Sequence, residues 1–365
     1  MYKEDKLAAL PYRRRILAEI NAYIERMRGE CDERRRDFFV RDMSTPLDYM
    51  LSSAPLREEF VKMLGRPLDG YAAQSDWQLD GNDRKPSEKY ELIKVGDDEY
   101  GSIYRLWVEV DAGLYSYGLL FLPNIVEGRE YPFVAALHGG LGTCEIVSSF
   151  YDSANYNDMV NRIRRRGEFI VYAPQLMLWG EGYNETKSDD SNHLGFDVLL
   201  KQVGGSIAAL EIFKILKTVD FITAKYPVDA ERMGIVGLSY GGFYTLFTAA
   251  ADTRWRCALS SCFFNDRYKY AWGDWVWFDS ASKFLDVEVA ELVCPRALCI
   301  QVGESDELFD VKSAERLADE VRGCYERLGI GERFRFSVKP DGHQFSPDED
   351  DIDFFVKRLT VSQGN

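Results

Sequence analysis

The fold of this chain is decided by residues 233–251, MGIVGLSYGGFYTLFTAAA, where an apolar run, a serine between glycines and a helical pattern follow without a gap. Residues 233–237 predict a buried strand and residues 243–251 predict a helix. Ser239 would occupy the sharp turn between them, where the backbone is strained and only very small neighbours fit. Gly237 and Gly241 meet that need. This order is typical of a nucleophile elbow, although G-x-S-x-G also occurs in ordinary glycine-rich turns.

An acid and a histidine follow the serine in the order Ser, acid, His. The apolar run 297–302 ends in Gly303-Glu304-Ser305-Asp306, and His343 lies in a loop after the strand-like run 334–338. The Asp306 carboxylate would fix the tautomer of His343 and stabilise the imidazolium formed when Ser239 gives up its proton. Three nearby acids are rivals for that role and are expected to be solvated instead: Glu304, Glu307 and Asp310. The sequence thus predicts Ser239, Asp306 and His343 as the catalytic residues.

A glycine-rich loop upstream supplies a candidate oxyanion hole. The apolar run 132–137 leads directly into His138-Gly139-Gly140-Leu141-Gly142. In acyl transfer the carbonyl oxygen gains negative charge, which preorganised backbone N–H groups stabilise. We assign these donors to Tyr240, the residue after the serine, and to Gly140 or Leu141. His138 is expected to brace the loop rather than to move protons.

Together these motifs resemble the α/β-hydrolase superfamily over about residues 92–365. Within it, residues 204–232 resemble the helix before the elbow in the acetyl xylan esterase-like and dienelactone hydrolase-like branch. The elbow is also similar to that of prolyl oligopeptidase-like serine peptidases. Dienelactone hydrolases proper have a cysteine where this chain has Ser239, so that type of lactone hydrolysis is not expected.

Composition and charge exclude several classes of partner. The chain has 365 residues, 46% of them hydrophobic, and 60 acidic against 45 basic side chains. Such a surface repels phosphate backbones and anionic lipids, so neither nucleic acid nor a membrane is an expected partner. Residues 1–6 are charged and no export signal follows, which favours the cytoplasm, although a removed signal peptide stays open. The seven scattered cysteines are expected to be buried free thiols.

Two parts are expected along the chain. Residues 1–85 predict a helical arm, with a long helix over 11–39 and a shorter one over 54–64. The long helix has an apolar stripe of Leu17, Ile20, Ile24 and Met27. The arm is expected to pack on the core, with a subunit interface of a homo-oligomer or a cover over the active site as alternatives. Residues 86–365 predict an α/β-hydrolase catalytic domain, a mostly parallel, doubly wound sheet with an antiparallel edge.

Two insertions are expected to carry substrate specificity. The first, near residues 174–200, contains Trp179 and His193, and the second, near 263–290, contains Trp272, Trp275 and Trp277. Flat rings suit sugar faces or an aromatic acyl group, so these tryptophans are candidates for substrate binding. The alternative is that they anchor a cap in the core. His193 is a further candidate for substrate contact, whereas a metal site with Asp189 and Asp190 is not expected.

These features predict a serine carboxylesterase that removes short acyl groups, with an acetylated xylan-type oligosaccharide or a smaller ester as substrate. The chemistry requires no metal and no organic cofactor. One alternative is a prolyl oligopeptidase-like peptidase or amidase, although the roughly 90 residues before the hydrolase domain are too few for a β-propeller. The other is a catalytically silent binding protein of the same fold. Activity on aryl esters and on aminoacyl-arylamides distinguishes these readings.

Overall fold

A single mixed sheet forms the body of the molecule. The computed structural model describes residues 1–74, 87–180 and 191–360. Within these residues nine strands form one sheet in the order β1-β2-β3-β5-β4-β6-β7-β8-β9. Their bounds are β1 Tyr90–Asp98, β2 Gly101–Asp111, β3 Leu114–Leu122, β4 Tyr131–Leu137, β5 Ile170–Pro174, β6 Val228–Leu238, β7 Cys257–Ser261, β8 Ala297–Gly303 and β9 Phe334–Lys339. The first three strands and β5 pair antiparallel, and all later pairings are parallel. The predicted fold class is confirmed.

The central strands are apolar along their whole length because both sheet faces are covered. In β4, Phe133, Ala135 and Leu137 face one core, while Val134 and Ala136 face the other. Side chains alternate between the faces of a strand, so β4 contributes apolar side chains to the cores on both sides of the sheet. The sheet therefore lies between two layers of helices, as a doubly wound architecture requires.

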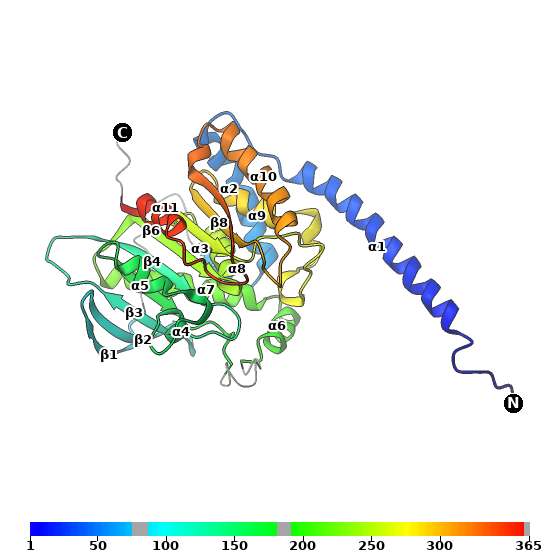
Figure 1. The fold of residues 1–365 in the computed structure, drawn as a ribbon, viewed down its shortest axis with the longest axis horizontal. Coiled ribbons are helices and arrows are strands. Elements are labelled where there is room, and N and C mark those ends of the chain that lie inside the picture. Colours follow the sequence, from blue (N-terminus) through cyan, green and yellow to red (C-terminus); the bar gives the residue numbers. More distant parts are fainter. Residues whose placement is uncertain (75–86, 181–190, 361–365) are drawn as a thin grey trace.

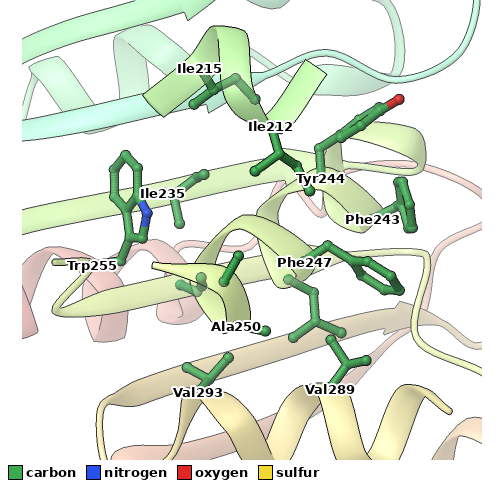
Figure 2. Packing of buried hydrophobic residues seen from close by; sticks show 14 of the residues in the cluster. Ile212, Ile215, Ile235, Phe243, Tyr244, Phe247, Ala250, Trp255, Val289 and Val293 are labelled. Carbon is green, nitrogen blue, oxygen red and sulfur yellow. The ribbon is translucent and has the colours of Figure 1, made fainter. Parts of the chain in front are cut away.

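One layer of helices is larger and carries the elbow helix at its centre. It contains α7 (Ile207–Lys225), α8 (Tyr240–Ala251), α9 (Asp286–Val293) and α10 (Val311–Arg327). Figure 2 shows Phe243 and Phe247 of α8 packed between α7 and α9. The other layer contains α4 (Cys144–Val147), α5 (Met159–Arg164) and α11 (Asp350–Thr360). Helix α8 is thus held rigidly on one side of the sheet, directly after the strand that carries Ser239.

The helices α2 (Pro46–Leu64) and α3 (Leu68–Gln74) belong to the body. Tyr49 and Phe60 of α2 are fully buried, and the Tyr49 hydroxyl donates to the Glu291 carbonyl over 2.9 Å. Helix α2 begins eight residues earlier than the sequence indicated and continues through Pro55. Its buried side chains and its Thr45 N-cap hold it together despite the hydrogen bond that the proline removes.

The first helix, α1 (Leu10–Phe38), differs from the expected packing. Only its last turns contact the body, where Arg35 pairs with Glu288 over 2.9 Å and Phe38 packs edge-on against Phe284. The apolar stripe of Leu17, Ile20, Ile24 and Met27 is exposed. In Figure 1 the outer part of α1 projects away from the body. The periodicity of the sequence identified the apolar side of this helix, but it did not identify what lies against that side.

The remaining features are the state of the cysteines and the hydropathy of the helices. All seven cysteines lie in described residues, and all are free and buried. Among the helices that the structure describes, none is both long and apolar enough to cross a bilayer.

Candidate active site

Ser239 lies on a strained turn between β6 and α8. Its backbone has φ 60° and ψ −121°, a conformation that costs energy for any residue with a Cβ. A Cβ on Gly237 would lie 2.4 Å from the Gly241 carbonyl oxygen, and one on Gly241 would lie 2.3 Å from the Leu137 carbonyl oxygen. Both glycines are therefore required by close backbone approach, as the sequence indicated. The turn raises the half-buried Ser239 at the C-terminal end of the sheet.

Asp306 and His343 meet across the loops that follow β8 and β9. His343 Nδ1 lies 2.9 Å from Asp306 Oδ2. The other carboxylate oxygen of Asp306 accepts hydrogen bonds from the backbone N–H groups of Leu308 and Phe309, over 2.8 and 3.2 Å. With Nδ1 donating to the carboxylate, Nε2 of His343 is the free base of the neutral ring.

The surroundings of Asp306 keep it ionised. Its side chain is 2% exposed, and burial by itself would raise its pKa. The hydrogen bond and charge of His343, together with the two backbone donors, outweigh burial and lower the pKa of Asp306 below its ordinary value. An ionised carboxylate is what stabilises an imidazolium during proton transfer.

The three rival acids lie elsewhere. Glu304 is exposed. Glu307 accepts a hydrogen bond from the backbone N–H of His343 over 3.2 Å, whereas the ring of His343 pairs with Asp306. Asp310 pairs with Lys269 over 3.2 Å and accepts from the Ser313 hydroxyl. The structure thus brings Asp306, and none of these three, to the imidazole of His343.

Backbone contacts connect the elbow with the Asp306–His343 pair. The Ser239 N–H donates to the Ser261 carbonyl at the end of β7 over 2.8 Å. The next residue, Cys262, has its sulfur within 4.8 Å of the ligand atoms of both Asp306 and His343. Among the described residues no hydrogen bond joins the Ser239 hydroxyl to His343, and such bonds are commonly long in ligand-free enzymes. The three predicted catalytic residues follow β6, β8 and β9, which end at the same edge of the sheet.

Cys262 completes a group of three potential metal ligands with Asp306 and His343. Burial raises the pKa of its thiol to about 12, and the sulfur donates to the Gln344 carbonyl over 3.3 Å. A thiol must lose its proton to bind zinc. This group is therefore better suited to proton transfer by His343 than to holding a metal ion.

His138 braces the loop after β4. It is fully buried, and burial lowers its pKa to about 4, so the ring is neutral near pH 7. Its Nδ1 donates to the Gly139 carbonyl over 2.8 Å, and its Nε2 accepts from the Leu176 N–H over 2.9 Å. The Gly139 N–H donates to the Tyr156 hydroxyl over 2.7 Å. Both ring nitrogens are occupied in fixing two loops, which fits a structural role.

The loop conformation leaves Gly140 facing the elbow. The N–H groups of Gly139 and Gly142 already have acceptors, the Tyr156 hydroxyl and the Gly139 carbonyl. A Cβ on Gly140 would lie 3.3 Å from the Tyr240 ring. Leu141 has φ 60° and forms an isolated bridge with Trp179. Of the two candidates in this loop, Gly140 is thus the one placed beside Tyr240.

The four predicted substrate-binding tryptophans fall in different environments. Trp272 is 37% exposed and stacks on Trp275, with ring centroids 4.3 Å apart. Trp275 is buried, and Trp277 stacks on Phe247 of the core. Trp179 is half-buried in the bridge with Leu141. Of these four tryptophans Trp272 is the most exposed, and it stacks on the buried Trp275.

Phe309 is a site residue that the sequence did not single out. Its ring lies 5.8 Å from Trp272 and 5.8 Å from His343 between centroids. Tyr240 lies 6.0 Å from Trp272 on the other side. These rings form a continuous aromatic wall from Tyr240, through Trp272 and Phe309, to His343. A phenylalanine three residues after the acid carries no sequence signal of its own.

His193 is buried at the back of this wall and does not reach solvent. Its Nδ1 lies 2.8 Å from the Met177 carbonyl and its Nε2 lies 3.1 Å from Asp274. Burial by itself disfavours the imidazolium, but the hydrogen bond and charge of Asp274 raise the pKa of His193. Its ring packs edge-on against Tyr240, at 5.5 Å between centroids. His193 is thus placed to support the wall rather than to contact substrate; Asp189 and Asp190 lie outside the described residues.

The sequence of this chain is similar to those of known hydrolases. The model of the prolyl oligopeptidase family matches residues 211–355, which include Ser239, Asp306 and His343. The protein named "Putative hydrolase YtaP" of Bacillus subtilis is 24% identical over 278 residues, which cover 72% of this chain and 88% of that protein.

Solved structures share the fold. One titled as a "putative acetyl xylan esterase" of Bacteroides fragilis matches with a TM-score of 0.62 at 12% identity, over 91% of this chain and 88% of that one. A glucuronoyl esterase of Solibacter usitatus matches with a TM-score of 0.61 at 13% identity, over 88% of this chain and 95% of that one. With its nine-stranded sheet and its strained serine elbow, the chain belongs to the α/β-hydrolase superfamily, has prolyl oligopeptidase-like relatives, and is a serine hydrolase.

Proposed function

We propose that the protein is a carboxylesterase that transfers a short acyl group to Ser239 and then to water. The observation that carries this proposal is the 2.9 Å contact between His343 Nδ1 and Asp306, which leaves Nε2 as a base at the same sheet edge as Ser239. His343 accepts the serine proton as the hydroxyl attacks the ester carbonyl, and then donates it to the leaving alcohol. Water then attacks the acyl-enzyme while His343 accepts its proton, and His343 donates that proton to the Ser239 oxygen as the acyl group leaves.

The oxyanion that forms in each step is assigned to the N–H groups of Tyr240 and Gly140. Tyr240 is the first residue of α8, so its backbone N–H lies at the positive end of the helix dipole. Gly140 faces the Tyr240 ring from the loop that His138 braces. Loss of one such donor costs about 3–4 kcal/mol of transition-state stabilisation in a well-studied serine hydrolase.

For the substrate we propose an acetylated carbohydrate of the xylan type. The half-exposed Trp272, between Tyr240 and Phe309, offers an apolar face of the kind on which sugar rings stack. Structures of this fold whose titles name esterases of carbohydrates support the choice. The seven free cysteines support a reducing compartment, such as the cytoplasm.

A panel of p-nitrophenyl acetate, butyrate and octanoate with acetylated xylo-oligosaccharide tests the proposal. We expect acetyl preference, and release of acetate from the oligosaccharide, both abolished in Ser239→Ala. An octanoyl preference contradicts the short-acyl assignment, and acetyl preference without oligosaccharide turnover contradicts the carbohydrate assignment alone.

The match to the prolyl oligopeptidase family favours a second candidate, a serine peptidase or amidase. The same three residues and oxyanion donors serve amide hydrolysis, so the site alone does not distinguish the two. Turnover of an aminoacyl-arylamide at a higher kcat/KM than that of the aryl acetate would favour this candidate.

A further inference from the structure

The outer part of α1 carries an apolar stripe that no described residue of its own chain covers. Seven large side chains, spaced three and four residues apart on one side of the helix, are 42–73% exposed. They are Tyr12, Ile16, Leu17, Ile20, Tyr23, Ile24 and Met27. Soluble proteins rarely expose an apolar patch of this extent unless it is an interaction site.

The helix is also poorly stabilised by its own sequence. Its N-cap, Ala9, makes no side-chain hydrogen bond, and its first turn has no acid. Arg13, Arg14 and Arg15 instead place positive charge near the positive end of the helix dipole. Most of the stability of a helix in a protein comes from tertiary packing of its apolar face, and the described residues offer no such packing to the outer part of α1. The 29-residue α1 therefore requires a surface to lie against.

A second uncovered apolar surface lies on the body, on helix α6 (His193–Gln202) and the residue after it. The exposed side chains are Leu194, Phe196, Val198, Leu199 and Val203, with exposed fractions between 41 and 67%. Only His193 and Asp197 of this helix are buried. In Figure 1, α6 lies at an edge of the body, while the outer part of α1 points away from it. The two surfaces of one chain consequently do not meet.

We propose that the occupant of both surfaces is a second copy of this chain, with α1 of each copy lying across α6 of the other. With a two-fold axis between the copies the two contacts are identical, and the assembly ends at the dimer. Each copy has a net charge of −15, so the two bodies repel, and the basic start of α1 is the part of each copy that is attracted to the other.

The apolar area available to the two contacts comes close to that of a stable pair. Complete burial of one large apolar side chain removes about 60–120 Å² from water. The twelve half-exposed side chains, buried in each of two equivalent contacts, bring the apolar area to the order of 1,000 Å², and stable interfaces bury about 1,200–2,000 Å² in total. Polar groups at the margins of the two contacts would supply the remainder.

Sedimentation equilibrium of the full chain at micromolar concentration tests the pairing. We expect twice the 41.9 kDa chain mass for the wild type and a single chain mass for the double variant Ile20→Glu/Ile24→Glu. The matched control is Ile125→Glu/Val126→Glu, which places the same charges on two exposed apolar side chains of the β3–β4 loop, and it should remain a dimer. A monomeric wild type, a larger assembly, or a dimer that survives the α1 variant overturns the proposal.

A photo-crosslink tests which surface α1 meets. Ile20 is replaced by p-benzoylphenylalanine, and ¹⁵N-labelled and unlabelled chains are mixed before irradiation. We expect mixed-isotope crosslinks from position 20 to peptides containing residues 194–203. Crosslinks to α1 of the other copy, or crosslinks confined to one chain, overturn the assignment of α6.

Discussion

The imidazole of His343 is oriented by Asp306, whose Oδ2 lies 2.9 Å from Nδ1 across two loops that are 37 residues apart in sequence. The carboxylate is itself fixed by two backbone N–H groups, so its direction does not depend on the histidine. This arrangement makes the ring a base at Nε2 and nowhere else. It is the contact on which the proposed chemistry depends most.

Removing the charge of Asp306 should therefore cost activity without loss of fold. Asp306→Asn is expected to lower kcat by about 10³–10⁴-fold, because the amide favours the wrong tautomer of His343. Glu307→Gln, which changes a neighbouring acid that contacts only the backbone of His343, is the matched control and should stay within about tenfold of wild type. Equal losses in the two variants, measured as kcat on an acetyl ester, would contradict the assignment of the acid.

The lowered pKa of Asp306 also predicts a stability effect in acid. A carboxyl whose folded-state pKa lies below its unfolded value stabilises the protein above the unfolded pKa, about 4. That contribution is lost as the pH falls through the folded pKa. Chemical unfolding at pH 7 and pH 3 should show a smaller decrease in the free energy of unfolding for Asp306→Asn than for wild type. A decrease of the same size in both proteins would count against the ionised carboxylate.

The lowered pKa of His138 predicts a decrease in stability that begins at a higher pH than the decrease caused by the carboxylates. Because its folded-state pKa is lowered to about 4, the unfolded chain takes up a proton below about pH 6.5 that the folded protein does not accept. The free energy of unfolding should therefore decrease as the pH falls from about 6.5 to 4. His138→Gln should lack this part of the decrease and should lower kcat more than it changes KM, since the ring positions the Gly140 loop. A His138→Gln variant with the full decrease would be evidence against a neutral buried ring.

His193 predicts the opposite dependence. Its folded-state pKa is raised, so its contribution is fully present below the unfolded pKa of about 6.5 and is lost as the pH rises through the folded value. His193→Gln leaves the buried Asp274 carboxylate without its cation, which typically costs about 3–5 kcal/mol. The double variant His193→Gln/Asp274→Asn should recover part of that loss. Losses that simply add, in urea unfolding at pH 6, would show that the two side chains are not coupled.

Trp272 should affect the carbohydrate part of the substrate and not the acyl part. An aromatic stacking contact is worth about 0.5–1.5 kcal/mol, so Trp272→Ala should raise KM for acetylated xylo-oligosaccharide about 2- to 10-fold. The KM for p-nitrophenyl acetate should stay near the wild-type value. Phe278→Ala serves as the control because that ring is fully exposed in the same cap segment. An unchanged KM for the oligosaccharide would remove Trp272 from the binding site.

The parts that could be predicted from the sequence are those whose signal is local. The elbow is encoded within five residues, because Gly237 and Gly241 are needed wherever that turn occurs. The buried parallel strands appear as continuous apolar runs, and their order in the chain fixed the fold class. The pairing of Asp306 with His343 followed from that order, since both residues come directly after strands that end at one sheet edge.

What could not be predicted depends on contacts between distant segments. Asp274 lies 81 residues from His193, and neither carries a motif, so their pair emerges only when the two insertions meet. Phe309 gains its place beside His343 from the loop that Asp306 orders. The direction of α1 was also hidden, because an apolar stripe indicates that a surface is needed and not which molecule provides it.

The most direct test of the central claim is the rate of acetyl ester hydrolysis by wild-type protein and by Ser239→Ala, with an aminoacyl-arylamide measured beside it. We expect acetyl ester turnover that falls by at least about 10³-fold in the variant, with little turnover of the arylamide by either protein. Ester turnover that persists in folded Ser239→Ala would contradict Ser239 as the nucleophile.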